Sequence, residues 1–225
     1  MLIDTHIHES KYSLDSEISL NDIIKRAKEI GLDGVCITDH ESNEIMEEAH
    51  ALSRSTGFLI LVGAEILTFE GDVLVFGLKD WPKEMMHAKD LLKLVHAHNG
   101  VAISAHPYRN NNRGFGNYIR EAKELGLSGV EAFNGSTDPH QNLYAYSLAT
   151  ELNLTCIGSS DAHVIEKIGT YATVFPDGIR DEIDLINVIK EGNVCPAIRQ
   201  DNGFKSIDIY NKVINNLPYD MYKAI

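Results

Sequence analysis

Short apolar runs alternate along this chain with segments in which apolar residues recur every three or four positions. LIDTHIH is followed by LNDIIKRAKEIG, DGVCITDH by NEIMEEAHALSRSTG, and the alternation continues as far as RDEIDLINVIKEG. The apolar runs have roughly four to eight residues, which is typical of strands buried on both faces, and the segments between them have helical spacing. Repeated strand–helix units predict parallel strands with right-handed crossovers.

The number of these units indicates the architecture. About seven strand–helix units in one domain favour a closed or nearly closed α/β barrel. An open doubly wound sheet is the alternative, because periodicity alone does not close a barrel. The run GDVLVFGL predicts an extra strand. We predict one domain over residues 1–225, with a C-terminal helix and tail over 201–225.

Composition and charge restrict the class of protein. The chain has 225 residues, 44% of them hydrophobic, and this is enough for a substantial core. The formal net charge of −13 opposes binding to nucleic-acid phosphates. We expect a cytoplasmic protein without a membrane partner, since no long apolar stretch or leader pattern is visible. Cys36, Cys156 and Cys195 lack CxxC spacing and predict buried free thiols, with a nucleophilic cysteine as the alternative.

Residue types that bind metals gather at the carboxyl ends of the predicted strands. In an α/β barrel these ends converge on one face, where active sites lie. Imidazole and carboxylate together suit Mn, Zn or Fe, and a carboxylate such as Glu65 could bridge two cations. The sequence therefore predicts a metal site at this face. Seven residues of these types lie at the strand ends: His6, His8, His40, Glu65, His106, Asp161 and His163.

Neighbouring positions support this prediction. Asp4, His6 and His8 alternate along one predicted strand and should share a face. Either Asp4 or Asp39 could accept the second ring N–H of a histidine and fix its tautomer. Taken alone, Asp39 could cap a helix and Glu65 could be a surface charge. The occurrence of several metal-binding residue types together at matching strand ends favours the metal site. The other histidines are expected outside it: His50, His87, His96, His98 and His140.

The ordered motifs DTHIHESKYSLDS, ITDH, GAEI, AHPYR and SSDAH resemble those of the PHP family, named for polymerase and histidinol phosphatase. The resemblance extends over about residues 1–200. It implies a distorted (β/α)7 TIM-like barrel with two or three divalent metal ions at the carboxyl ends of the strands. It also implies hydrolysis of phosphoesters, either small phosphomonoesters or nucleic-acid ends.

The resemblance also implies roles for individual residues. Arg109, in AHPYR, resembles the family's phosphate-binding arginine, and a guanidinium suits bidentate recognition of phosphate. A solvated loop residue is the alternative for Arg109. The implied ligands are His6, His8, Glu65 and Asp161 for one metal, Asp15, His40 and His163 for another, and His106 for a third that shares Glu65.

One position departs from the family's pattern. Three-metal members carry a histidine on the strand between the bridging glutamate and AHP, whereas this chain has Leu74 there. We therefore expect a third metal to be weakly held or absent. Glu131, in GVEAFNG, could replace that ligand or could have a structural role.

The function expected from these features is direct hydrolysis of small phosphomonoesters of the nucleotide or histidinol-phosphate type. A metal-bridging hydroxide would attack phosphorus while the metals and Arg109 neutralise the phosphoryl oxygens. Glu65, Asp161, His163 and Arg109 are the expected catalytic residues. The alternatives are a nuclease acting on nucleic-acid ends, an amidohydrolase-type metal hydrolase, and a non-catalytic metal-bound module.

Overall fold

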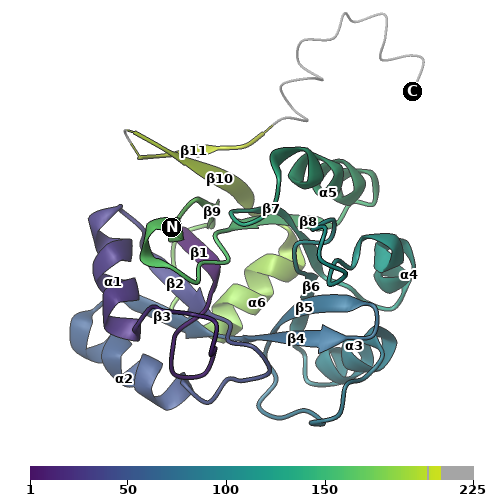
Figure 1. Cartoon of the computed structure of the whole chain (residues 1–225), viewed down its shortest axis with the longest axis horizontal. Coiled ribbons are helices and arrows are strands. Elements are labelled where there is room, and N and C mark those ends of the chain that lie inside the picture. The colour runs from purple at the N-terminus through teal and green to yellow at the C-terminus, as the bar shows by residue number, and fades with distance from the viewer. Residues whose placement is uncertain (202, 209–225) are drawn as a thin grey trace, which may run out of the picture.

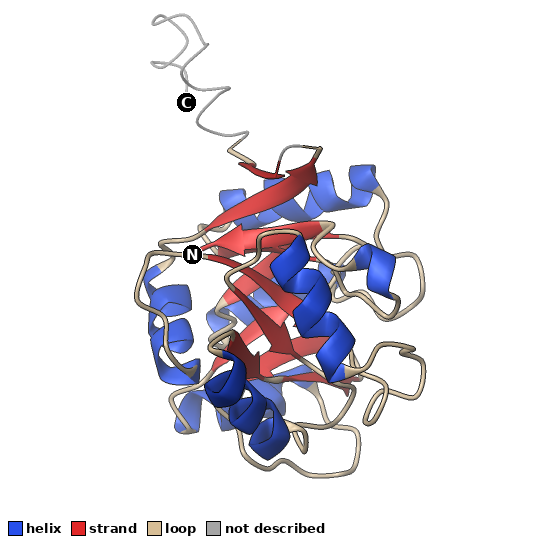
Figure 2. Cartoon of the chain, turned by 90° about the vertical axis from the view of Figure 1, so that its left-hand side faces the viewer, coloured by secondary structure: helices blue, strands red, loops and turns tan. Residues whose placement is uncertain are grey.

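A computed structural model describes residues 1–201 and 203–208, and its strands form two sheets with helices outside them (Figures 1 and 2). The helices are α1 (Leu20–Glu29), α2 (Met46–Thr56), α3 (Ala88–Ala97), α4 (Ile119–Glu124), α5 (Pro139–Glu151) and α6 (Glu182–Glu191), with short 3-10 turns at Gly116–Tyr118 and Ile165–Lys167. The strands are β1 (Leu2–Ile7), β2 (Gly34–Ile37), β3 (Leu59–Val62), β4 (Ala64–Thr68), β5 (Gly71–Phe76), β6 (Val101–Ser104), β7 (Gly129–Asn134), β8 (Thr155–Ser159), β9 (Tyr171–Val174), β10 (Cys195–Gln200) and β11 (Gly203–Ser206).

The ends of several helices follow from local sequence. The Ser19 hydroxyl accepts the Asp22 N–H at the start of α1, and the Asp181 carboxylate accepts the Asp184 N–H at the start of α6. Both contacts satisfy a backbone donor that has no partner within its helix. Gly57 ends α2 in the left-handed conformation, which glycine adopts without a steric penalty.

The two sheets contain both parallel and antiparallel pairs. One has the order β11-β10-β9-β1-β2-β3 and the other the order β4-β5-β6-β7-β8. Strands β1 to β3 and β6 to β8 are parallel, as predicted, because helices connect them. The prediction of parallel strands is wrong for β4, β5 and β9, which pair antiparallel with their neighbours. Strands β10 and β11, which the sequence analysis did not predict, are also antiparallel. Short hairpins join β4 to β5 and β10 to β11, and a hairpin reverses the strand direction.

The sheets meet on both sides at the carboxyl ends of their parallel strands. Isolated parallel bridges join Ile7 to Ala162 and His40 to Glu65. The Asp161 N–H donates to the His6 carbonyl at 2.8 Å on the first side. Within the described residues, neither side forms a continuous ladder. The α/β class is confirmed, and the predicted barrel is a distorted one that these bridges connect at one end.

The core between the sheets explains why that end carries the chemistry. Ile3, Leu74, Phe76 and Ile157 are fully or almost fully buried there. The apolar face of α6 packs into the same cluster, against residues at the starts of β1 and β6. The helix therefore covers the amino ends of these strands and leaves the carboxyl ends open. Helices α1 and α2 cover the outer face of β1 to β3, while α3, α4 and α5 cover the other sheet (Figure 1).

The segment predicted as a C-terminal helix and tail, 201–225, is described only over its first residues. Residues 203–206 form β11, which pairs with β10 instead of beginning a helix. The rest of that predicted segment, residue 202 and residues 209–225, lies outside the described residues. Among the described helices, none has the length and apolar character to cross a membrane.

The cysteines are free thiols. Cys36 is buried, as predicted, whereas Cys156 and Cys195 are partly exposed. Burial raises the pKa of the Cys156 thiol to about 12 and also raises the pKa of the Cys36 thiol. A thiolate is the nucleophilic form of cysteine, so these environments oppose the alternative of a nucleophilic cysteine.

Candidate metal centre

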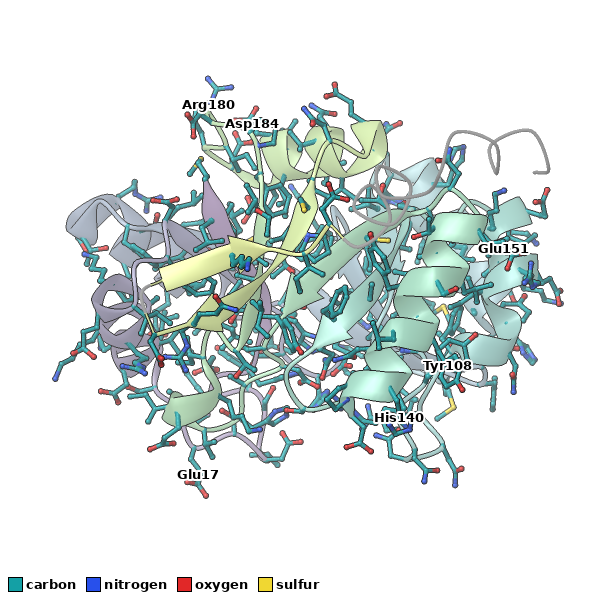
Figure 3. The ribbon with its side chains drawn as sticks, turned by 90° about the horizontal axis from the view of Figure 1, so that it is seen from above. Glu17, Tyr108, His140, Glu151, Arg180 and Asp184 are labelled. Carbon is teal, nitrogen blue, oxygen red and sulfur yellow. The ribbon has the colours of Figure 1, made fainter. Side chains whose placement is uncertain are left out.

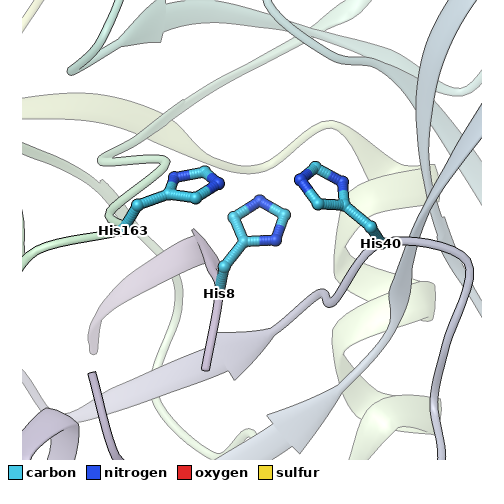
Figure 4. Close-up of side chains that lie close together, drawn as sticks. All are labelled: His8, His40 and His163. Atoms are coloured by element: carbon cyan, nitrogen blue, oxygen red, sulfur yellow. The ribbon is translucent and has the colours of Figure 1, made fainter. Parts of the chain in front are cut away.

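The carboxyl ends of the parallel strands bring the predicted ligand residues together. Three groups of side chains have potential ligand atoms within 4.8 Å of one another, and all of the strand-end residues predicted from the sequence belong to them. Figure 4 shows one group, in which three imidazoles from separate segments face each other. The groups are His8, His40 and His163; His6, His8 and Asp161; and Glu65, Asp72 and His106.

Glu65 lies at the junction of the three groups. Its Oε2 is 2.9 Å from His40 Nδ1, 3.4 Å from His8 Nε2 and 3.6 Å from His6 Nε2. Its Oε1 is 2.8 Å from His106 Nε2. A buried carboxylate that contacts members of every group has the geometry that a bridging ligand requires.

The Asp161 carboxylate faces His6 in β1 and His8 directly after it. Its Oδ1 is 3.4 Å from His6 Nε2 and 3.3 Å from His8 Nε2, and those two nitrogens are 2.9 Å apart. This Oδ1 is buried and has no hydrogen-bond donor among the described residues. Buried polar atoms of this kind need a partner, and two imidazole nitrogens beside a carboxylate suit a divalent cation. The residues therefore fit the metal ions that the sequence predicts.

Asp15 lies at the outer edge of the centre. Its Oδ2 is 3.2 Å from His40 Nε2 and 3.4 Å from His163 Nε2, and its side chain is 57% exposed. The loop that carries it is fixed by the Ser16 hydroxyl, which donates to the His8 carbonyl at 2.8 Å. The structure thus places Asp15 beside the two histidines with which the resemblance groups it.

The charges in the centre shift the pKa of its members. Burial lowers the pKa of His6, but the carboxylates of Asp161, Glu131 and Glu65 outweigh it and raise that pKa well above the ordinary value. Burial raises the pKa of Glu65 and Asp161, but His6 and other neighbouring groups hold both well below their usual range. Burial lowers the pKa of His8 to about 4. The carboxylates therefore create a negative potential that favours a bound cation.

Glu131 belongs to none of the three groups and contacts a residue in each of two of them. Its Oε1 is 2.9 Å from His6 Nδ1, and its Oε2 accepts the backbone N–H of His106 at 2.7 Å. A carboxylate on the second nitrogen of a ligand imidazole fixes the tautomer and the ring orientation. Of the two roles that the sequence left open for Glu131, the structure favours the structural one.

The two aspartates expected to orient histidines have other contacts. Asp4 accepts the backbone N–H groups of Ser160 and Gly169, each at 2.9 Å, and no histidine ring N–H among the described residues. Asp39 acts through Ser13, whose hydroxyl donates to it at 2.8 Å and lies 3.2 Å from His8 Nδ1. Sequence reasoning missed Ser13, because a serine in a loop gives no signal of its own.

The third group contains Asp72, a residue that sequence reasoning also missed. Glu65 pairs with Leu74 across the β4–β5 hairpin, but the Leu74 side chain is buried in the core. Because β5 runs antiparallel to β4, positions closer to the hairpin lie closer to the carboxyl face. Asp72 is one of these, and its Oδ2 is 3.7 Å from His106 Nε2. The connection between β4 and β5 is too short for a helix and therefore indicates a hairpin, and this was the signal that could have identified Asp72.

Arg109 lies beside the centre and is not a solvated loop residue. Its Nη2 donates to Asn134 Oδ1 at 2.7 Å and also to Asp161, while its Nε donates to Thr137 Oγ1 at 3.2 Å. Its side chain is 19% exposed. Three partners therefore fix the guanidinium at the mouth of the centre.

A cavity of about 210 Å³ lies over these groups, and a second hollow of about 370 Å³ adjoins it through Arg109. The five other histidines lie outside the groups formed by the described residues. The cavity over the centre is lined by Asp15, His40, Glu65, Asp72, His106, Arg109, Asn111, Arg113, Asp161 and His163.

Comparison with known proteins places this centre in a family. A family model described as PHP-associated matches residues 139–194. The chain is 33% identical over 145 residues to the uncharacterized protein MJ1587 of Methanocaldococcus jannaschii, a match that covers 60% of this chain and 82% of that protein. It is 29% identical over 87 residues to the PolC-type DNA polymerase III of Lacticaseibacillus paracasei, covering 39% of this chain but only 6% of the polymerase.

A solved structure has the same fold. A two-domain protein from Bacteroides vulgatus, described as containing a predicted PHP-like metal-dependent phosphoesterase, superimposes with a TM-score of 0.69 at 18% identity. The match covers 87% of this chain and 64% of that protein. The motifs, the fold and the sequence relatives agree, and the chain belongs to the PHP family.

Proposed function

We propose that this chain is a metal-dependent hydrolase that releases phosphate from small phosphomonoesters. The observation that carries the proposal is the position of Glu65, which contacts members of all three ligand groups. Arg109 lies beside Asp161, which belongs to one of these groups. The negatively charged ligand groups suit metal ions, and the fixed guanidinium beside them suits anionic oxygens. A phosphorylated substrate fits both, because its oxygens can contact the metal ions and accept N–H groups from the guanidinium.

The ligand groups suggest how the metals would be held. His6, His8 and Asp161 would hold one cation, and His40, His163 and Asp15 would hold another, with Glu65 between them. Divalent cations bound there would lower the pKa of a coordinated water toward neutrality and polarise a phosphoryl oxygen. Mn, Zn or Fe would each suit a mixed set of imidazoles and carboxylates.

The protein's own side chains position the substrate and the ligands. Arg109 would donate N–H groups to the phosphoryl oxygens, where negative charge develops in the transition state. Asn134 and Thr137 hold this guanidinium, so little conformational freedom is lost when phosphate binds. Glu131 keeps His6 in one orientation, and Ser13 contacts His8.

The cavity and the charge both favour a small substrate. About 210 Å³ over the centre suits a phosphoryl group with part of its leaving group, and the adjoining hollow offers room for the rest. The net charge of −13 opposes the many contacts with phosphate groups by which proteins bind extended nucleic acid.

A nuclease acting on nucleic-acid ends is the second candidate, and the similarity to PolC-type DNA polymerases favours it. Binding to single-stranded or duplex DNA that weakens steeply with salt would support this alternative. An amidohydrolase-type reaction is a further alternative, which would proceed without phosphate release and without a need for Arg109.

The test is phosphate release from a panel of phosphomonoesters, nucleotides and DNA ends with added Mn²⁺. Wild-type protein should release phosphate, Asp161→Ala should not, and Asp177→Ala should behave as wild type because Asp177 is fully exposed outside the centre. The ranking of substrates would identify the leaving group. Absence of phosphate release from every monoester would contradict the proposal.

A further inference from the structure

Arg113 and Asp72 form a fork at the edge of the metal centre. Arg113 Nε donates to Asp72 Oδ2 at 2.7 Å, and its Nη2 donates to Oδ1 at 2.9 Å. The Asp72 side chain is 1% exposed, whereas that of Arg113 is 39% exposed and lines the cavity over the centre. Two parallel bonds from a guanidinium to a carboxylate form the strongest and most specific pairing between these side chains.

The backbone around Arg113 fixes this fork in place. The Asp72 N–H donates to the Arg113 carbonyl at 3.0 Å, which ties the loop to β5. A Cβ atom at Gly71 would lie 2.8 Å from that same carbonyl, so the close approach requires glycine there. The Arg113 N–H is accepted by Asn111 Oδ1 at 3.1 Å. Arg113 is therefore held against Asp72 from both its backbone and its side chain.

The fork lies where the third ligand group needs positive charge. Glu65 and Asp72 bring two buried carboxylates beside one imidazole, His106. Such a set would attract a divalent cation, but both oxygens of Asp72 already accept bonds from a permanently charged guanidinium. The position that could add a nitrogen ligand is occupied by Leu74 in the core.

We propose that the Arg113 guanidinium takes the third cation position, so that this chain works with two metal ions and one fixed organic cation. The inference rests on the metal centre of the proposed function. A guanidinium neutralises Asp72 and can hold an anionic oxygen of the substrate. It cannot activate water as a metal does. Arg113 and Arg109 then present two positive charges to the cavity over the centre.

The contact between Arg113 and Asp72 has a competing interpretation. Asp72 could be a ligand of a third metal, and Arg113 could only orient its carboxylate. The number of metal ions bound at saturation separates the two, because the first interpretation predicts two ions and the second predicts three.

The experiment is to saturate each protein with Mn²⁺, remove free ion by equilibrium dialysis and measure ions per chain by mass spectrometry. Wild type should bind two. Arg113→Met should bind three, because Asp72 is then free, and Arg113→Met with Asp72→Asn should return to two. Arg120→Met is the matched control and should bind two, since Arg120 makes a similar fork to Glu151, at the exposed end of α5 (Figure 3).

Three ions in the wild type, falling to two in Asp72→Asn, would overturn the inference. Two ions in a folded Arg113→Met would overturn it as well. The wild-type count remains decisive if Arg113→Met does not fold, and Arg113→Lys, which keeps the positive charge, should then bind two. Absence of any bound ion in the wild type would instead contradict the metal centre and with it the proposed function.

Discussion

The two sides of the metal centre are built in different ways. On one side, parallel strands β1, β2 and β8 end in histidines and an aspartate that converge on two ligand groups. On the other, β4 and β5 form an antiparallel hairpin, and the third group pairs its aspartate with an arginine. Helix-connected strands place their last residues on a common face. A hairpin reverses this order, so the first residues of β5 lie at the centre.

The largest effect is expected from Glu65, which belongs to both sides. Glu65→Ala removes contacts to every ligand group, and we expect at least about a thousandfold loss of kcat, as for the loss of a principal electrostatic element. Metal content should fall in parallel. Phosphate release and bound ions should be measured on the same samples. Unchanged metal content in Glu65→Ala would contradict the bridging position.

Leu74→His tests the hairpin side of the comparison. The family pattern suggests that it would supply a ligand, whereas the structure places this side chain in the core with Phe76 and Ile103. We expect the free energy of unfolding to fall by about 2–5 kcal/mol without an additional bound ion. Denaturant unfolding measures this, and Leu143→His, at a half-exposed position of α5, is the control. A gain of one metal ion without loss of stability would contradict the core position of Leu74.

Glu131→Gln tests the support of the parallel side. The amide keeps the shape of the side chain but loses the charge that faces His6 Nδ1. We expect metal affinity to fall by about 10–100-fold, the usual effect of losing a carboxylate that orients a ligand histidine. A titration with Mn²⁺ measures the affinity. Wild-type affinity in this variant would exclude a role for Glu131 in positioning His6.

The smallest effect is expected from Ser13→Ala. The hydroxyl donates to Asp39, lies beside His8 Nδ1 and accepts the His40 N–H at 3.2 Å. Its loss should lower the free energy of unfolding by about 1–3 kcal/mol, since buried partners are left unpaired. Thermal unfolding with and without Mn²⁺ measures the effect, and Ser55→Ala on the exposed surface of α2 is the control. Equal stability of the two variants would exclude a contribution of the Ser13 hydroxyl to the free energy of unfolding.

The residues predicted from the sequence and those missed differ in how their positions arise. His8, His40 and His106 follow strands whose apolar runs are visible locally, and parallel strands bring such ends together. Asp72 depended on the direction of β5, which hydrophobic periodicity does not encode. Ser13 reaches the centre through a loop, and loop paths depend on contacts between distant segments.

The C-terminal segment illustrates the same limit. Its sequence contains Asn202-Gly203, a pair typical of tight hairpin turns, but hydrophobic periodicity does not register a turn, and the structure shows a hairpin between β10 and Gly203–Ser206. The α/β class, in contrast, depends on a pattern repeated along the whole chain, and its prediction is confirmed.

Metal-dependent release of phosphate is the central claim, and adding metal back to stripped protein tests it most directly. Wild-type protein freed of metal by a chelator should release no phosphate from the best substrate of the panel, and Mn²⁺ should restore release. Glu65→Ala should remain inactive at the same Mn²⁺ concentrations. Equal phosphate release with and without metal, or full activity in Glu65→Ala, would contradict the account.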